Sequence, residues 1–143
     1  MSATDPRTLY ERWLLELWQG EESVAHEILS DDFTIHQARS EPGESEAVRG
    51  AQAGIELVRM GRAPFSRVTF AIEVGPIVEG DMVAARWMGR GAYAGGFPGA
   101  TAPEGTDVAF GGIDIMRVAD GRLAEYWVSS DGIALMQQLG ALG

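Results

Sequence analysis

The spacing of apolar residues changes near residue 64, and this change constrains the fold more than any other feature of the chain. Before that point apolar residues recur every three to four positions, as they do in helices that bury one face. Beyond it they alternate with polar residues, as they do in half-buried strands. The sequence therefore predicts an α+β fold in which helices pack on one face of an antiparallel sheet.

Three helices are predicted in the first part of the chain. Asp5 is a suitable N-cap, Pro6 suits the first helical position, and the helical spacing that follows ends at Gly20. A second helix over about 22–29 leads into a short strand, "DDFTIHQ". A third helix, with apolar spacing over 47–58, ends where glycine and proline supply a stop.

Four antiparallel strands and a terminal helix are predicted in the second part. Gly75-Pro76 interrupts the first strand, as a bulge or bend does. The loop "GGFPGATAPEG" is too long for a tight hairpin and is typical of a lid or a pocket rim. Such strands bent over helices form a cone whose apolar interior suits a small molecule. The predicted ranges are 68–74, about 82–90 and about 107–118 for the first three strands and 133–139 for the helix, and the fourth strand follows the turn at 119–121.

Composition restricts the ligands. The 143 residues correspond to one domain, 1–143, and the N-terminus has no signal-peptide pattern, so the expected location is cytoplasmic. A net charge of −10 opposes binding to nucleic acid or to an anionic membrane. The chain has no cysteine and two histidines, which disfavours zinc, whereas counting alone leaves a carboxylate site for magnesium or calcium open. A neutral or weakly polar small molecule fits best.

Asp114 is the first candidate for chemistry. It shares one face of the third strand with Phe110 and other apolar residues, and desolvation there raises the pKa of a carboxyl group. Ile113 and Ile115 make the opposite face apolar too, so the direction of Asp114 stays open. The alternative is a structural role in which its carboxylate binds a backbone amide or an arginine.

Asp131 is the second candidate. By alternation it shares a face of the fourth strand with Leu123 and Trp127, so it points into the cone if they do. Ser129, Ser130 and Asp131 are also good N-caps for the terminal helix, and spacing alone favours the cap.

Five further residues have both a functional and a structural interpretation. His36 alternates with buried positions of the short strand and is suited either to proton transfer or to a structural hydrogen bond. Arg86 lies between apolar neighbours and needs an oxygen partner, from the protein or from a ligand. Tyr93, Phe97 and Trp127 are suited to contact a flat substrate or to fill the core.

The order of these motifs resembles the SnoaL-like polyketide cyclases of the nuclear transport factor 2-like superfamily. The shared pattern is "RWMGRGAYAGGFPG", then "PEG", then "DIMRVADGRLAEYWVSSD", and a closing "QLG". The resemblance implies a cone-shaped fold and an intramolecular aldol reaction on an aromatic polyketide, without metal or cofactor. It implies that Asp131 is the acid/base, and that Asp114 matches a protonated aspartic acid of the related ketosteroid isomerases.

One departure from that pattern widens the choice of function. Many cyclase-like sequences have G-T-H after the arginine-bearing strand, where this chain has "GAY", with Ala92 and Tyr93. An accessory hydroxylase and a non-catalytic ligand-binding domain are therefore the alternatives to a cyclase. The outer face of the sheet needs cover for its apolar residues, so a homodimer or tetramer is expected.

Overall fold

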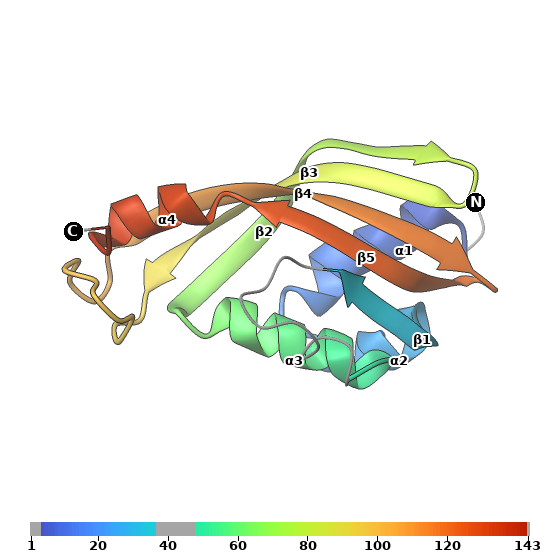
Figure 1. Ribbon diagram of the computed structural model, residues 1–143, viewed down its shortest axis with the longest axis horizontal. Coiled ribbons are helices and arrows are strands. Elements are labelled where there is room, and N and C mark those ends of the chain that lie inside the picture. Colours follow the sequence, from blue (N-terminus) through green and yellow to red (C-terminus); the bar gives the residue numbers. More distant parts are fainter. Residues whose placement is uncertain (1–3, 37–47, 143) are drawn as a thin grey trace.

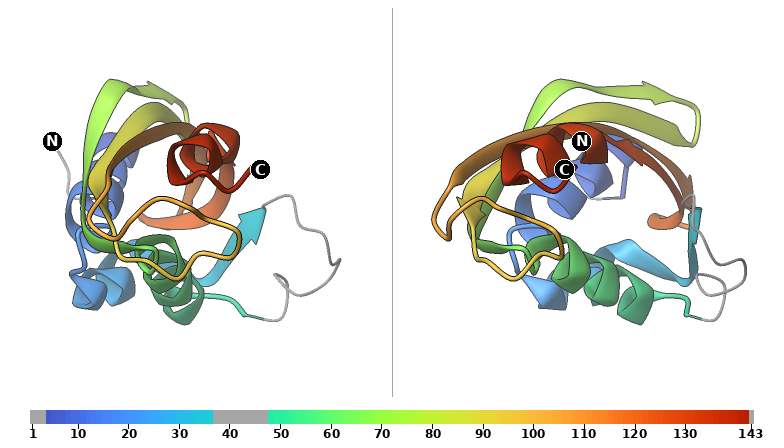
Figure 2. Two further views of the ribbon diagram at one scale, coloured as in Figure 1. Left: turned by 90° about the vertical axis from the view of Figure 1, so that its left-hand side faces the viewer. Right: turned by 60° about the vertical axis from the view of Figure 1, so that its left-hand side comes forward.

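A strongly curved sheet of five strands arches over α1, α2 and α3, which lie against its concave side (Figure 1 and Figure 2). The computed structural model describes residues 4–36 and 48–142. The α+β cone predicted from the sequence is confirmed. Along the chain the elements are α1 (Pro6–Arg12), the π-helix η1 (Trp13–Leu17), the 3₁₀-helix η2 (Glu22–Val24), α2 (Ala25–Ile28), β1 (Leu29–His36), α3 (Ala51–Arg62), β2 (Phe65–Glu79), β3 (Met82–Tyr93), β4 (Asp107–Ala119), β5 (Arg122–Ser130) and α4 (Gly132–Leu139).

The strands are ordered β1-β5-β4-β3-β2. The four long strands pair antiparallel, as predicted, and the short strand β1 pairs parallel with β5 at one edge. β1 begins at Leu29, so the predicted second helix is shorter and consists of η2 followed by α2. Ala47, the first residue of the predicted third helix, lies outside the described residues, and α3 begins at Ala51.

The first helix begins as the sequence predicts and then changes type. The Asp5 side chain accepts a hydrogen bond from the Thr8 backbone N–H at 2.9 Å, and Pro6 follows at the first position. The helix continues as a π-helix, in which the Trp18 N–H donates to the Trp13 carbonyl five residues earlier. None of the helices formed by residues 4–36 and 48–142 is both long and apolar enough to cross a membrane.

β2 passes through the predicted interruption instead of ending there. The Gly75–Pro76 peptide bond is cis, and the pairing of β2 with β3 shifts register on both sides of Val74. Such irregularities bend a strand and increase its twist. The sheet is strongly curved, as both views in Figure 2 show.

α4 is fixed to the end of β4 and β3 by polar contacts. The Gln138 side chain accepts from the Ala109 N–H at 2.8 Å and donates to the Ala109 carbonyl at 2.7 Å. The long loop between β3 and β4 donates the N–H groups of Thr101 and Ala102 to the Leu139 carbonyl. α4 is thereby held at one end of the cone, where its N-terminus borders the interior.

Candidate active site

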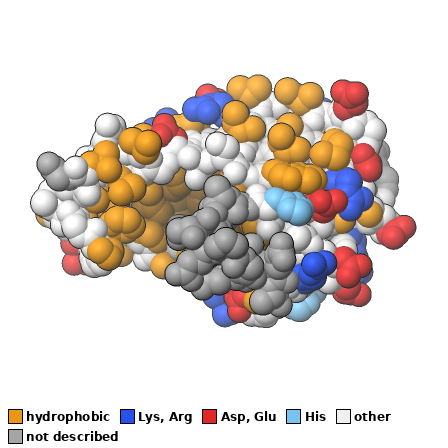
Figure 3. All heavy atoms as spheres, in the orientation of Figure 1, with side chains coloured by type: hydrophobic (Ala, Val, Ile, Leu, Met, Phe, Trp, Pro, Cys, Tyr) orange, Lys and Arg blue, Asp and Glu red, His pale blue; other side chains and the backbone are white. Residues whose placement is uncertain are grey.

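The concave side of the sheet encloses a cavity of about 250 Å³ between the sheet, η1, α3 and α4. This volume is slightly below the range of about 300–1,000 Å³ that is usual for small-molecule pockets. Figure 3 shows the hollow, surrounded by hydrophobic side chains. Its described lining consists of Leu14, Trp18, Leu57, Met60, Gly61, Pro64, Phe65, Phe70, Trp87, Phe110, Asp114, Tyr126, Val128, Ser130, Asp131, Gly132 and Leu135.

Two glycines allow large rings to form the walls. A Cβ atom on Gly61 of α3 would lie 2.5 Å from the ring of Trp18, and one on Gly112 of β4 would lie 2.5 Å from the ring of Trp87. Both distances are far below van der Waals contact, so only glycine lets these indoles lie where they do. The two tryptophans therefore occupy positions that a side chain on either glycine would block.

Asp114 lies at the inner end of this cavity and is 1% exposed. Its Oδ2 accepts from the Tyr10 hydroxyl at 2.9 Å. Its Oδ1 accepts from the Trp87 indole N–H and from the Tyr126 hydroxyl, both at 3.0 Å. Asp114 therefore points inward, an orientation that the sequence left open. Its hydrogen bonds come from three aromatic side chains instead of from an arginine or a backbone amide.

Burial raises the pKa of Asp114 from its ordinary value of 3.8 to about 6. Desolvation is the largest cause, because it penalises the ionised form. The hydrogen bonds from Tyr10, Tyr126 and Trp87 act in the opposite direction. The buried N–H of Trp13 also favours the carboxylate, although it reaches no hydrogen-bond geometry with any described residue. The pKa of Asp114 thus lies close to neutral pH but below it, so the ionised form predominates.

The two tyrosines that bind Asp114 are neutral donors. Burial raises the pKa of both Tyr10 and Tyr126, and the negative charge of Asp114 raises it further. Neither hydroxyl therefore loses its proton to the neighbouring carboxylate. They orient Asp114 and stabilise its charge, and Tyr126 itself lines the cavity.

Asp131 is both a helix cap and part of the cavity wall. Its Oδ1 accepts from the Ala134 N–H at 3.1 Å, and its backbone N–H donates to the Gly111 carbonyl at 2.8 Å. Its Oδ2 has no hydrogen bond from any residue of 4–36 or 48–142. The side chain is exposed at the cavity's edge, so one oxygen caps α4 and the other is open to a ligand.

Asp131 lines the cavity, but the alternation along β5 that was used to predict this position is the wrong reason. Tyr126, Val128 and Ser130 line the cavity, so the inner face of this part of β5 is the one that Trp127 does not share. Alternation alone would place Asp131 outside with Trp127. It reaches the cavity because β5 ends at Ser130 and the chain then turns into α4.

The two carboxyl groups line one cavity without sharing a proton. Asp131 pairs through its backbone with Gly111, three residues before Asp114 on β4. With a rise of about 3.3 Å per residue, this places the two backbones about 10 Å apart. Each carboxyl group therefore acts in its own environment, one buried and one exposed. Among residues 4–36 and 48–142, no group of three histidine, aspartate or glutamate side chains is arranged to hold a metal ion.

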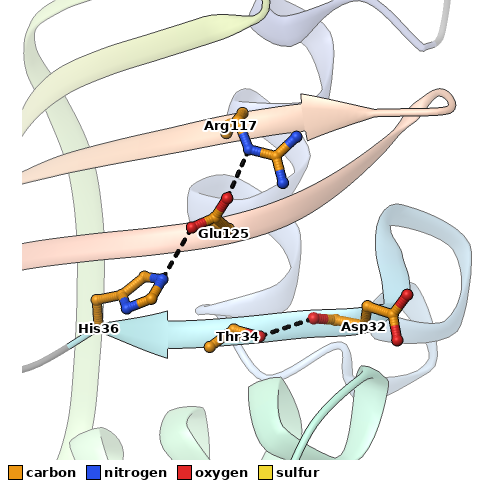
Figure 4. A network of polar contacts seen from close by, with 5 residues as sticks. All are labelled: Asp32, Thr34, His36, Arg117 and Glu125. Atoms are coloured by element: carbon orange, nitrogen blue, oxygen red, sulfur yellow. Dashed lines mark hydrogen bonds and ion pairs between the residues drawn. The ribbon is translucent and has the colours of Figure 1, made fainter.

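His36 and Trp127 lie on the outside of the molecule, contrary to the prediction that they contribute to the pocket. The His36 ring stacks on the Trp127 ring, with centroids 4.9 Å apart and planes at 16°. Its Nε2 lies 2.9 Å from Oε2 of Glu125, which also accepts from Arg117 at 2.6 Å (Figure 4). Mainly through Arg117, these partners lower the pKa of Glu125. Figure 4 shows this network along the outer edge of β1, β5 and β4, where Asp32 and Thr34 also interact.

The other predicted ligand contacts divide between the cavity, the surface and the core. Phe110 lines the cavity as predicted. Arg86 points to the outer face and binds Glu73 at 3.0 Å. Tyr93 is buried, and its hydroxyl accepts from the Phe97 N–H at 2.6 Å, which fixes the start of the long loop. Arg86, Tyr93 and Phe97 are absent from the described lining, so they serve structural roles here.

Sequence reasoning missed the three donors around Asp114. Trp87 lies on the same face of β3 as the buried Val83 and Ala85, and Tyr126 is the neighbour of Trp127 in the sequence. A buried carboxylate requires hydrogen-bond donors, and tyrosine and tryptophan are the apolar residues that carry one. Searching the inner faces for such residues would have found them.

The fold and the cavity define the class of the protein. A curved sheet enclosing a pocket with helices on its concave side is the cone of the nuclear transport factor 2-like proteins. The model of the SnoaL-like polyketide cyclase family matches residues 8–139. The chain therefore belongs to the SnoaL-like polyketide cyclase family.

Solved structures agree with this assignment of the fold. A candidate polyketide cyclase from Acidithiobacillus ferrooxidans is 22% identical with a TM-score of 0.80, over 97% of each chain. IdmH, a candidate polyketide cyclase from Streptomyces antibioticus, is 26% identical with a TM-score of 0.74, over 89% of this chain and 93% of that one. AclR, a candidate hydroxylase from Streptomyces galilaeus, is 21% identical with a TM-score of 0.74, over 94% and 95%. A search of curated proteins gave no match.

Proposed function

We propose that the protein is a cofactor-independent enzyme that catalyses an intramolecular aldol reaction on a flat, polycyclic aromatic carbonyl compound. The observation that carries the proposal is Asp114, a carboxyl group that lines an apolar cavity and is 1% exposed. General bases work best when their pKa lies near the working pH, and burial has moved the pKa of Asp114 to about 6. An exposed aspartate is a much weaker base.

The reaction follows from this one group. Asp114 takes a proton from the carbon next to a carbonyl, which leaves an enolate. The enolate carbon attacks a second carbonyl of the same molecule, so that a carbon–carbon bond forms and an alkoxide results. Asp114 then returns the proton to the alkoxide oxygen, and no electrons are gained or lost. The chain contains no lysine, so no lysine side chain is present to activate the carbonyl as a Schiff base.

Tyr126 is placed to support the enolate. Its hydroxyl donates to Asp114 in the resting site and its ring lines the cavity. Once Asp114 carries a proton it needs fewer donors, and the Tyr126 hydroxyl becomes available to a substrate oxygen. Asp131, with one oxygen free at the cavity's edge, is suited to accept a hydrogen bond from a substrate hydroxyl and to fix its position.

Hydrogen exchange tests the base directly without the natural substrate. The flat ketone 2-tetralone has acidic protons next to its carbonyl, and NMR follows their replacement in D₂O. We expect the protein to accelerate exchange about 10²–10⁴-fold over an acetate buffer control, the usual gain from a placed general base. Asp114→Asn should abolish the acceleration, and Asp131→Asn should retain most of it. Equal rates with protein and with buffer would refute the proposal.

The same experiment separates the alternatives. If Asp131→Asn abolishes exchange and Asp114→Asn does not, Asp131 is the base, as the family resemblance implies. A hydroxylase would consume molecular oxygen during turnover, whereas ring closure consumes none. A pocket without a carboxylate would favour a domain that only binds ligands, and two carboxylates line this one. Acceleration of the exchange by the protein is therefore the observation that separates catalysis from binding.

A further inference from the structure

Asp114 is a buried carboxyl group without a positively charged partner among residues 4–36 and 48–142. Its three hydrogen-bond donors, from α1, β3 and β5, are neutral, and no described residue forms a salt bridge with it. The titratable groups that face it are Tyr10 and Tyr126, and both stay uncharged. A buried charge that lacks a counter-ion is costly, and removing that cost favours any cation that reaches it.

The described part of the cavity wall carries no positively charged side chain. Among its described lining residues none is an arginine or a histidine, and the chain has no lysine. Asp131 adds a second carboxyl group at the edge, with one oxygen free. The chain as a whole carries a charge of −10, so the surrounding field also attracts cations and repels anions.

Aromatic rings form much of the wall next to Asp114. The rings of Phe70, Trp87 and Phe110 lie close together, with centroids 5.7–6.2 Å apart. Their planes meet at 73°, 88° and 85°, so the three rings are nearly perpendicular to one another. Phe65, Trp18 and Tyr126 complete the aromatic lining. Aromatic faces attract organic cations, most strongly in places from which water is excluded.

From these three observations we infer that the cavity binds organic cations, specifically compounds in which an aromatic or alkyl body carries an ammonium group. The ammonium group lies near Asp114, and the apolar body contacts the rings. A neutral molecule of the same shape gains only the apolar contacts, and an anion is repelled while Asp114 is ionised. This inference does not depend on the proposed reaction, because it concerns binding alone.

A pair of isosteric probes tests it. Phenyltrimethylammonium is permanently charged at every pH, and tert-butylbenzene has the same shape without the charge. Dissociation constants are measured at pH 8 by tryptophan fluorescence, since Trp18 and Trp87 line the cavity. We expect the cation to bind at least tenfold more tightly than its neutral isostere. Equal affinity, or tighter binding of the neutral probe, overturns the inference.

The pH dependence and two variants locate the charge that matters. The advantage of the cation should fall severalfold between pH 8 and pH 5, as Asp114 takes up a proton. Asp114→Asn should remove most of the advantage at pH 8. Asp120→Asn changes the net charge equally in the exposed turn after β4 and should leave it unchanged. An equal loss in both variants, or no pH dependence in the unaltered protein, overturns the inference. The pH dependence needs no variant, so it tests the inference even if Asp114→Asn fails to fold.

Discussion

The two faces of β4 reverse the usual distribution of polar and apolar residues. On the concave face Asp114 is 1% exposed, whereas its neighbours Ile113 and Ile115 on the convex face are 47% and 41% exposed. Alternation along a strand decides which face a residue occupies, whatever its chemistry. A strand that buries a carboxylate and exposes two isoleucines is therefore constrained by something other than its own stability.

Each face shows what that constraint is. Inside, three donors from separate elements converge on Asp114, which keeps a charge where an apolar residue would be more stable. Outside, Val74 and Ile77 of β2 add to the exposed isoleucines of β4. Exposed apolar side chains on one sheet face are typical of surfaces that become covered. We therefore expect the inner face to serve the proposed chemistry and the outer face to serve the proposed association.

The largest expected effect is the dependence of stability on Asp114 and pH. Its pKa is about 6 when folded and 3.8 ordinarily, so the folded state holds this proton more tightly. The contribution of Asp114 to the free energy of unfolding is therefore fully present below about pH 4 and is lost as the pH rises through 6. At 1.36 kcal/mol per pKa unit, the loss is about 3 kcal/mol.

Comparison with Asp114→Asn isolates this contribution. Urea unfolding of both proteins from pH 4 to pH 8 should show the free energy of unfolding of the unaltered protein falling relative to that of the variant by about 3 kcal/mol. Other carboxylates titrate in both proteins and cancel. A difference that stays constant over this range would show that the pKa of Asp114 is not raised.

The second effect concerns the convex face. We expect the protein to form a homodimer or tetramer in which this face is covered. Ile115→Glu places a charge on this face opposite Ala84 and Trp127 and should weaken association at least 100-fold, since burying an unpaired charge costs several kcal/mol. Sedimentation equilibrium measures the mass at micromolar concentration. Ile133→Glu, the same change at an exposed position of α4, is the control. A monomeric unaltered protein contradicts the expectation.

The third effect returns to the donors of Asp114. Tyr10→Phe removes the hydrogen bond to Oδ2, and Tyr126→Phe removes one of the two to Oδ1. A hydrogen bond to a charged group contributes about 1.5–3 kcal/mol, so each change should raise the pKa of Asp114 by about one to two units. Carboxyl carbon NMR follows the titration. Tyr93→Phe alters a buried tyrosine whose hydroxyl accepts from the Phe97 N–H, and it should leave the pKa of Asp114 unchanged.

The sequence predicted the elements and one face of the sheet better than it predicted the site. Alternation around Asp114 identified the correct strand and the correct set of neighbours, because β4 pairs with β3 without a register shift. The choice between the two faces required knowledge of where the helices pack. Single-strand alternation cannot supply that knowledge when Ile113 and Ile115 make both faces apolar.

The errors arise at the ends of strands. Trp127 was placed inside by continuing the alternation of β5 from Leu123. His36 lies on the face of β1 opposite the buried Ile35, and its ring meets that of Trp127 on the outer side, where β1 pairs parallel with β5. The donors Tyr10, Trp87 and Tyr126 come from three elements far apart in the sequence. Their convergence depends on the curvature of the sheet and on packing, which no local pattern encodes.

The smallest expected effect separates the two roles of Asp131, where the inner face ends and α4 begins. Asp131→Ala removes both the cap and the carboxylate, and should cost about 1 kcal/mol in the free energy of unfolding. Asp131→Ser keeps an oxygen for the Ala134 N–H and should cost a few tenths at most, while it removes the oxygen that is open to a ligand. Urea unfolding measures the first property and the affinity for phenyltrimethylammonium the second. If Asp131→Ser has the stability of the unaltered protein but the weaker affinity of Asp131→Ala, capping and ligand binding are separate properties of the same carboxylate. If Asp131→Ser matches the unaltered protein in both, Asp131 serves only as the cap.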